Sequence, residues 1–573
     1  MGYLTSLVVA ALVGQTHAYD PYDPIAGYSP SSDVTDQMHL DKDLKQLEDN
    51  LKVNLEGSFD IYQYGGHSKS VASLKLSDPT FDSSTIVAGK KFTGTSVDGN
   101  VAIAMKLDDS TNTLGYLKLQ YEVSGQNPCN VGGLVTPDGN GCFGASGTVT
   151  DGTNVISYDS IDNMNALTLK SLGDSSTVKM GSNHEMFIKY YGKANYADHW
   201  VTQAFKGEAT DFKNGNADFS EYSIIGQVEA IKKGIAYISA LQYMFHKLEE
   251  AVSTCDEDVD LECWDEGVAY YVGSLQGPEL APGGGKFPYV LADKRCSNFK
   301  TCGQSPPFAT GTVSWVNHNV MPKFHMGKNA LVKGDCKLAT TVLGQISKLV
   351  YIPLIQGTLR YAYKVQFLQS GDANVLEKEQ AEGTVFAAAV LPVIYKSDKK
   401  AAATIYDNMQ IGAVETNFAA VKEAFEKVYG KLHINCANVG CLIESGPNTC
   451  YSGADACPAE CPDKKNTDSK KTVTVPEMGQ NAVSCGELAL MPAKYRHVFC
   501  ANNEVEKACP GTCLGTCLCF DDPNDCEDLW NDKKFAKTCK KNKNGEVEKC
   551  PSTCAGFCDS IPFTKKYKGP KER

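Results

Sequence analysis

Apolar residues recur at helical spacing through the middle of the chain. Between Ile224 and Ala251 they fall every three or four positions, which predicts one long helix with an interior stripe. A shorter apolar stripe, formed by Leu44, Leu47, Leu51 and Leu55, predicts a helix near the N-terminus. We expect this helix to end at Gly57. The segment Phe187 to Phe205 and the stretch from about 220 to 432 also show helical character.

Between Phe59 and about Met180 the pattern changes to short alternating runs. Val101 to Leu107 and Gly115 to Val123 are two such runs, separated by Asp-Gly and Gly-Asn pairs typical of turns. We therefore expect a mixed α/β portion over residues 19–180 with strands in it.

Two segments of the helical region resemble each other. Glu266-Gly267 and Glu382-Gly383 each open an apolar helical run, and Gly-Gln pairs at 226 and 344 begin the segments upstream. The period of roughly 115 residues predicts a mainly α-helical body over 181–435, built from two related helical repeats at about 220–280 and 340–432. We expect both glutamates at the starts of their helices, where the helix dipole favours negative charge.

The cysteine content points to an oxidising compartment. The chain has 23 cysteines, and 16 of them lie from Cys436 onward, which predicts a disulfide-rich C-terminal region over 436–573 with a basic tail. Residues 1–18 read as a secretory signal peptide, and no later apolar run is long enough for a transmembrane segment. We expect a secreted, periplasmic or cell-surface protein. Local disulfides are expected within three close pairs, Cys129 with Cys142, Cys255 with Cys263, and Cys296 with Cys302.

Charge and arginine usage narrow the choice of ligand. The net charge of −13 argues against nucleic-acid partners and is compatible with a cation-binding surface. Lys and Arg together number 55, but only four of these are Arg. Because a guanidinium can hold an oxyanion at two points, Arg295 and Arg360 in the repeated region are candidate anion-binding residues. Stacking on an aromatic ring or capping of a helix would explain them equally well.

The densest polar-aromatic cluster lies at 190–200. Its phenols, carboxylate and imidazole could converge on a hard cation, or the rings could pack between helices with their hydroxyl groups satisfied. Tyr270 lies one turn beyond Glu266 on the same helical face. The second copy has Phe386 in place of Tyr270, so the first copy is the expected metal binder. The candidate metal ligands are Tyr191, Asp198, His199, Glu266, Tyr270 and Glu382.

The sequence contains no familiar catalytic motif. A nucleophile elbow, a phosphate loop, a dinucleotide fingerprint and an HExxH helix are all missing. We therefore do not expect an enzyme. One alternative is an extracellular structural or adhesive matrix protein. Another is a metal-dependent enzyme of inorganic-carbon metabolism, which the lack of a three-histidine cluster among ten histidines disfavours.

Four sequence blocks carry a resemblance to a known family: YYGKANYADHWVTQAF, CWDEGVAYYVGSLQGP, ADKRCSNFKTCG and PCNVGGLVTPDGNGCFGASGTVT. Together they resemble the algal iron-assimilation proteins of the FEA type, which include the diatom phytotransferrins, over roughly residues 40 to 430. The resemblance implies capture of ferric iron, Fe(III), at the cell surface with carbonate as a synergistic anion. A cell-surface receptor or wall component is a further candidate partner. Surface-anchored members have a membrane segment that we do not find in this sequence.

Overall fold

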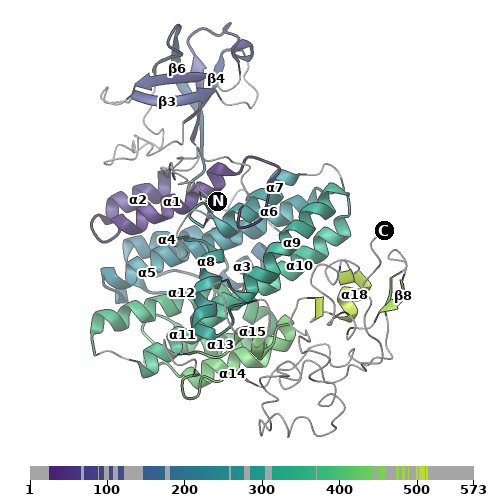
Figure 1. Ribbon diagram of the computed structural model, residues 1–573. Coiled ribbons are helices and arrows are strands. Elements are labelled where there is room, and N and C mark those ends of the chain that lie inside the picture. The colour runs from purple at the N-terminus through teal and green to yellow at the C-terminus, as the bar shows by residue number, and fades with distance from the viewer. Residues whose placement is uncertain are drawn as a thin grey trace, which may run out of the picture.

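The computed structural model describes residues 25–65, 70–87, 90–95, 102–107, 114–121, 146–174, 181–256, 260–276, 284–303, 313–368, 371–413, 415–443, 449–457 and short stretches between 473 and 513. These residues form a helical body, a small antiparallel barrel that stands off it, and disulfide-linked segments towards the C-terminus (Figure 1). The prediction of a mainly helical fold with strands in the N-terminal portion is confirmed. The signal peptide and the Cys129 and Cys142 pair lie outside the described residues.

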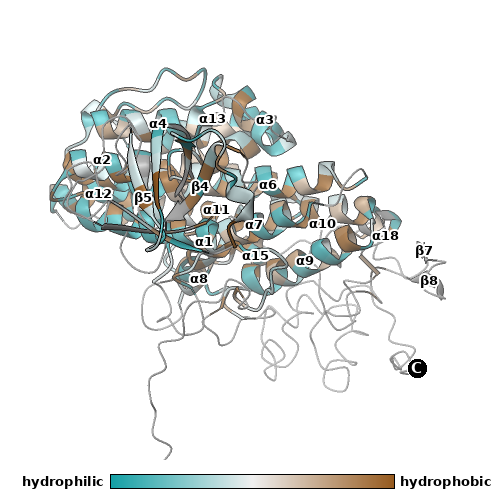
Figure 2. Ribbon diagram, turned by 90° about the horizontal axis from the view of Figure 1, so that it is seen from above, coloured by the Kyte–Doolittle hydropathy of each residue, from teal (hydrophilic) through white to brown (hydrophobic). Residues whose placement is uncertain are grey.

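The helical body surrounds one large apolar core in which Trp200, Trp264 and Trp315 are fully buried. Figure 2 shows apolar faces and polar faces alternating around these helices. A π-helix at Ile235–Ala240 joins α5 to α6, so the long predicted helix is continuous. The helices are α1 Thr35–Asn50, α2 Leu55–Tyr64, α3 Ser182–Tyr191, α4 Tyr196–Lys206, α5 Ile224–Gly234, α6 Leu241–Ser253, α7 Leu261–Val272, α8 Pro288–Phe299, α9 Trp315–Val332, α10 Cys336–Leu349, α11 Ile352–Phe367, α12 Ala373–Ser397, α13 Lys399–Met409, α14 Phe418–Tyr429 and α15 Cys436–Val439.

Two helix boundaries differ from the prediction. Gly57 does not end a helix; it lies in the first turn of α2, where its N–H donates to the side chain of the N-cap residue Asn54. The segment Phe187 to Phe205 is two helices, because Gly192 takes the left-handed conformation with φ 80° and ends α3.

The barrel is an insertion between α2 and α3. Its strand order is β1-β4-β3-β2-β5-β6, with every neighbouring pair antiparallel. Alternate side chains such as Leu74, Leu76, Leu117 and Leu119 fill the interior, which forms an apolar core separate from that of the helices. The strands are β1 Ser70–Leu76, β2 Lys91–Thr95, β3 Ala102–Leu107, β4 Tyr116–Tyr121, β5 Gly147–Thr150 and β6 Val155–Ala166.

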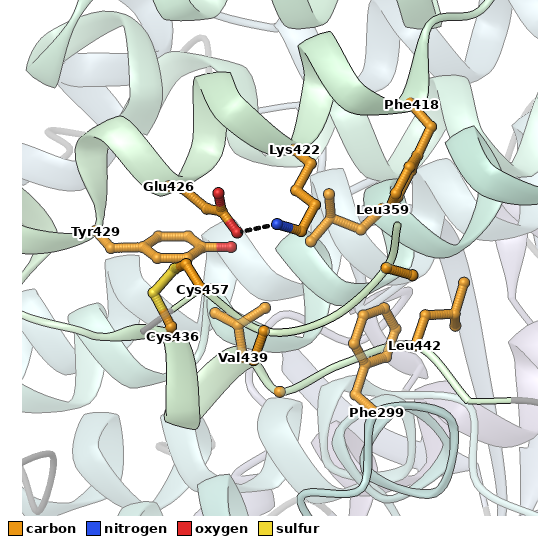
Figure 3. Close-up of a pocket in the computed structure, with 13 residues that line it drawn as sticks. Phe299, Leu359, Phe418, Lys422, Glu426, Tyr429, Cys436, Val439, Leu442 and Cys457 are labelled. Carbon is orange, nitrogen blue, oxygen red and sulfur yellow. Dashed lines mark ion pairs between the residues drawn. A yellow bond between two sulfur atoms is a disulfide. The ribbon is translucent and has the colours of Figure 1, made fainter. Parts of the chain in front are cut away.

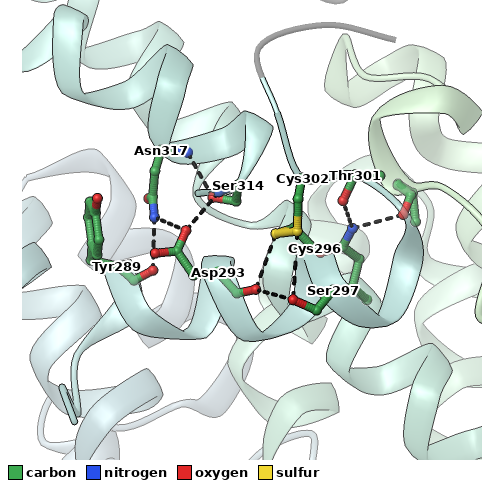
Figure 4. Close-up of a disulfide and its surroundings, with 10 residues drawn as sticks. Tyr289, Asp293, Cys296, Ser297, Thr301, Cys302, Ser314 and Asn317 are labelled. Atoms are coloured by element: carbon green, nitrogen blue, oxygen red, sulfur yellow. Dashed lines mark hydrogen bonds between the residues drawn. A yellow bond between two sulfur atoms is a disulfide. The ribbon is translucent and has the colours of Figure 1, made fainter. Parts of the chain in front are cut away.

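Disulfides occur both within the helical body and within the C-terminal segments. Cys296 and Cys302 pair as predicted, at the end of α8 (Figure 4). The predicted pair of Cys255 with Cys263 is wrong: Cys255 pairs with Cys336 at the start of α10, and Cys263 is a free, buried thiol. Cys263 lies in the first turn of α7, where its thiol contacts Glu250 and Asp260 instead. Further pairs are Cys436–Cys457, Cys441–Cys450, Cys485–Cys509 and Cys500–Cys513.

This number of disulfides fits an extracellular or secreted protein. The C-terminal segments include β7 Val473–Val475, β8 Gln480–Val483 and α18 Asn503–Ala508. They meet the helical body at Lys323 of α9, which is fully buried and donates to Gln345 Oε1 at 2.9 Å and to the Cys513 carbonyl at 3.1 Å. Cys336–Phe367, which spans α10 and α11, is apolar and long enough to cross a membrane, but 67% of its most apolar window is buried, which is typical of a core helix.

Candidate functional site

The three candidate metal ligands on α3 and α4 each engage a different partner. The Tyr191 hydroxyl donates to the Ala388 carbonyl at 2.7 Å. Asp198 accepts from the Tyr62 hydroxyl at 2.9 Å, and His199 lies 2.7 Å from an Asp211 carboxylate oxygen. The structure does not bring these side chains together around one point.

Glu266 and Tyr270 are neighbours on one face of α7, as expected. The Glu266 carboxylate lies 2.9 Å from the Lys247 ammonium of α6 and accepts from Gln37 Nε2 at 2.5 Å. The Tyr270 ring packs edge-on against Tyr243, with 5.2 Å between ring centroids. Burial, followed by the nearby Glu266 carboxylate, raises the pKa of Tyr270 well above its usual value. The Glu266 carboxylate is thus already paired with a cation, the ammonium group of Lys247.

Glu382 forms a similar pair on α12. Its carboxylate lies 3.0 Å from the Lys233 ammonium of α5 and accepts a hydrogen bond from the Tyr361 hydroxyl of α11. Burial by itself would raise the pKa of Glu382, but Lys233 and the Tyr361 hydrogen bond hold that pKa well below its usual range. Lys233 and Lys247 are 14 positions apart on continuous helix, about 20 Å along the axis, so these are two separate clusters.

Neither glutamate lies at the start of its helix. The Asp260 side chain caps α7 and the Asp372 side chain caps α12, so Glu266 is in the second turn and Glu382 in the third. The Glu-Gly pair recurs at these two positions because each glycine allows a neighbouring helix to approach closely, not because the glutamate interacts with a helix dipole. A Cβ at Gly267 would lie 2.6 Å from Leu248 Cδ2, and one at Gly383 would lie 3.0 Å from Tyr361 Cβ. Each glycine therefore permits close helix packing, and the preceding carboxylate is buried as a result.

Arg295 of α8 lies beside the Glu382 cluster. Its guanidinium carbon is 5.9 Å from the Tyr361 ring centroid and 5.8 Å from that of Phe386, and the residue is only 8% exposed. Arg360 approaches the same Tyr361 ring at 5.0 Å. The structure thus brings together Glu382, Arg295 and Arg360, all selected from the sequence as candidates.

The guanidinium of Arg295 is not satisfied by the protein. Its Nε and Nη1 atoms are buried and have no hydrogen-bond partner among the described residues. Lys233 pairs with Glu382, and Lys232 pairs with Glu229 at 2.8 Å, so both nearby carboxylates already have a cation. Since an unpaired buried charge costs several kcal/mol, as an order of magnitude, this site favours an anionic ligand.

Two features hold α8 in place on either side of Arg295, the contacts of Asp293 and the Cys296–Cys302 disulfide, and both are drawn in Figure 4. Asp293 Oδ1 accepts from the Ser314 N–H at 2.7 Å and from Asn317 Nδ2 at 2.8 Å. The Cys296–Cys302 disulfide lies directly after Arg295 in the chain. These contacts hold α8 from both sides of Arg295, which preorganises its guanidinium.

Two phenols of this cluster were not selected from the sequence. Burial raises the pKa of Tyr361 to about 12, and the Tyr237 ring stacks on Phe386 with 5.2 Å between centroids. Tyr243 and Tyr361 each lie 17 residues after the Gly-Gln pairs at 226 and 344, and this shared spacing is the sequence signal that could have identified Tyr361. For Tyr237 and Lys233 the sequence gives no such signal, because they lie in helices far in sequence from Tyr361 and Glu382.

The crevice beside α14 and α15 is too small to be a ligand site. Figure 3 shows it between apolar side chains, the Lys422–Glu426 ion pair and the Cys436–Cys457 disulfide. Its volume is about 10 Å³, which is room for a single water molecule.

Comparison with family models, with curated proteins and with solved structures gave no match for this chain. Within the described residues, no group of three or more His, Cys, Asp or Glu side chains is placed to hold a metal ion.

Proposed function

We propose that this protein captures ferric iron together with carbonate, and that Arg295 holds the anion. The observation that carries the proposal is the buried guanidinium of Arg295, which faces the Tyr361 ring and has two nitrogens without a hydrogen-bond partner among the residues that the structure describes. Carbonate oxygens could accept charge-assisted hydrogen bonds from these nitrogens. The adjoining Tyr361 hydroxyl and Glu382 carboxylate would supply metal ligands beside that anion.

The donor atoms favour a hard cation. Tyr361, Tyr237 and Glu382 offer oxygen ligands, which suit ferric iron better than they suit softer metals. Most cysteines described by the structure are used in disulfides, so thiolate ligation is not expected at this site. The acidic net charge of −13 is compatible with attraction of a cation.

We propose further that the two helical segments are repeats of which the second binds iron. Tyr243 beside Glu266 corresponds to Tyr361 beside Glu382, and a glycine follows each glutamate. Among the described residues, no arginine lies at the carboxylate of the first segment, whereas Arg295 and Arg360 both lie at the second. This differs from the expectation that the first copy is the metal binder.

The experiment is a ferric titration of the mature protein with and without bicarbonate, following the visible charge-transfer band of iron-bound tyrosinate. We expect a saturable band that requires bicarbonate and is lost in Tyr361→Phe and in Arg295→Gln. Tyr243→Phe is the matched control, because it changes the corresponding ring of the first segment and should leave the band intact. A band that survives Tyr361→Phe but is lost in Tyr270→Phe would place iron at Glu266 instead.

A structural or adhesive role is the second candidate. It is favoured by the ion pairs of Lys247 with Glu266 and Lys233 with Glu382, which satisfy both glutamates without any ligand. Absence of saturable iron binding in either buffer would favour this role and would make the clusters part of the scaffold.

A further inference from the structure

A second candidate binding site lies far from Arg295 in the sequence. A cavity of about 300 Å³ opens between the loop after α4, the end of α3, the end of α12 and the outer face of α13. This volume is at the small end of the range for small-molecule sites. Its lining residues include Tyr190, Lys213, Tyr395, Lys399, Ala403 and Tyr406.

The walls of this cavity are fixed by hydrogen bonds. Asn214 Nδ2 donates to the Tyr190 carbonyl at 2.7 Å, and the Tyr406 hydroxyl donates to the Asn216 carbonyl at 2.9 Å. Gly215 between them has φ 71°, and a Cβ there would lie 2.8 Å from Tyr190 Cε1. The loop can close onto the ring of Tyr190 only with glycine at this position. The cavity is therefore preformed rather than assembled by a ligand.

Aromatic rings and ammonium groups share the lining. Tyr190 and Tyr395 meet edge to face, with 5.2 Å between ring centroids. The Lys399 ammonium lies 5.2 Å from the centroid of the Tyr395 ring. Neither Lys213 nor Lys399 forms an ion pair with another residue in the described part of the chain, and Asp407 is the one carboxylate among the lining residues. The lining thus has an excess of positive charge.

We propose that this cavity binds a small ring-bearing carboxylate. The flat ring would pack against the tyrosines in the offset or edge-to-face arrangements that aromatic pairs adopt. The carboxylate would accept charge-assisted hydrogen bonds from Lys213 and Lys399. An organic cation of the same shape is disfavoured, because it would have to approach two ammonium groups.

The test is calorimetric titration of the full chain with benzoate, compared with acetate and benzylammonium. We expect saturable binding of benzoate, weaker binding of acetate, and none of benzylammonium. The double variant Lys213→Ala with Lys399→Ala should weaken benzoate binding at least about ten-fold, because both charge-assisted contacts are lost. Ala403→Trp should abolish benzoate binding by filling the cavity from the exposed side of α13.

Lys400→Ala is the matched control, since Lys400 is an exposed neighbour of Lys399 on α13 outside the lining. It should bind benzoate like the unchanged protein, and all three variants should retain the far-ultraviolet circular dichroism of the parent. No benzoate binding at millimolar concentration, equal binding of benzylammonium, or undiminished binding by Ala403→Trp would each overturn the proposal. None of these outcomes bears on iron binding at Arg295, which involves none of the lining residues.

Discussion

Most buried charges in the helical body have hydrogen-bond partners, whereas two nitrogens of Arg295 have none among the described residues. The fully buried Asp265 accepts from the Ser32 N–H at 3.0 Å and lies 3.4 Å from the Lys328 ammonium. Lys323 is equally buried and has two acceptors. Arg295 departs from this pattern: two of its nitrogens have no hydrogen-bond partner among the described residues, and its guanidinium lies over the Tyr361 and Phe386 rings.

The unpaired charge leads to a stability prediction. In bicarbonate-free buffer, Arg295→Met should raise the free energy of unfolding by about 1–3 kcal/mol, because an apolar side chain of similar length removes an unpaired buried charge. Bicarbonate should stabilise the unchanged protein and have no effect on the variant. Urea unfolding in the two buffers measures both effects. If Arg295→Met destabilises the protein equally in both, the arginine serves packing and not anion binding.

Proton competition should make iron binding depend on pH. Burial raises the pKa of Tyr361 to about 12, so the phenol is protonated at neutral pH and must release a proton to bind iron. Glu382, whose pKa is held low, stays ionised and contributes nothing to this dependence. Apparent iron affinity should therefore fall about ten-fold per pH unit for each proton released as pH is lowered from 8 to 6. Competition against a weak chelator at each pH gives the slope, and a flat profile would exclude a phenolate ligand.

At the scale of elements, glycines determine how closely the helices pack. Gly327 of α9 faces Trp264 of α7, and a Cβ at Gly327 would lie 2.0 Å from Trp264 Cζ2. Gly344 of α10 faces open space, with nothing within 4 Å of its Cβ position. Two glycines in helix interiors thus have opposite roles: one permits a helix contact, and the other only weakens its helix.

These two glycines make a matched pair for mutation. Gly327→Ala should lower the free energy of unfolding by about 1–3 kcal/mol, because the new methyl group overpacks the contact with the Trp264 ring. Gly344→Ala should raise the free energy of unfolding by about 0.5–1 kcal/mol through helix propensity alone. Thermal and urea unfolding of both variants measure these changes. Equal effects of the two substitutions would show that the close contact of α9 with α7 does not limit stability.

At the scale of the whole molecule, the barrel and the helical body have separate apolar cores. The helices α1 and α2 pack into the helical core although they precede the barrel in the chain. The first strand of the barrel, β1, begins at Ser70, and the last, β6, ends at Ala166; these two residues are partners in the β1–β6 ladder. The two ends of the insertion are therefore adjacent, about 5 Å apart between Cα atoms.

This arrangement predicts that the barrel can be removed. Replacing residues 70–166 with a short Gly/Ser linker should leave the helical body folded, with its iron binding intact, because no residue of the proposed site lies in the barrel. The full chain should unfold in more than one calorimetric transition, and the transition lost in the deletion variant should belong to the barrel. A single transition in the full chain, or an unfolded deletion variant, would show that the two cores depend on each other.

The sequence by itself determined the elements and the unusual residues. Apolar spacing identified the helical middle of the chain and strands such as β3 and β4, because local periodicity reflects which face of an element is buried. The scarcity of arginine singled out Arg295 and Arg360, and the repeated Glu-Gly pair singled out Glu382. Helix starts were misplaced because the capping residues Asp260 and Asp372 went unrecognised.

Only the tertiary structure decided which of these residues meet. Lys233 forms an ion pair with Glu382, which is 149 positions away in the sequence, and Cys255 forms a disulfide with Cys336 rather than with the nearer Cys263. Such contacts depend on how whole helices pack, which local periodicity does not encode. The same packing gave Tyr191, Asp198 and His199 other partners, while two nitrogens of the Arg295 guanidinium have no hydrogen-bond partner in the part of the chain that the structure describes.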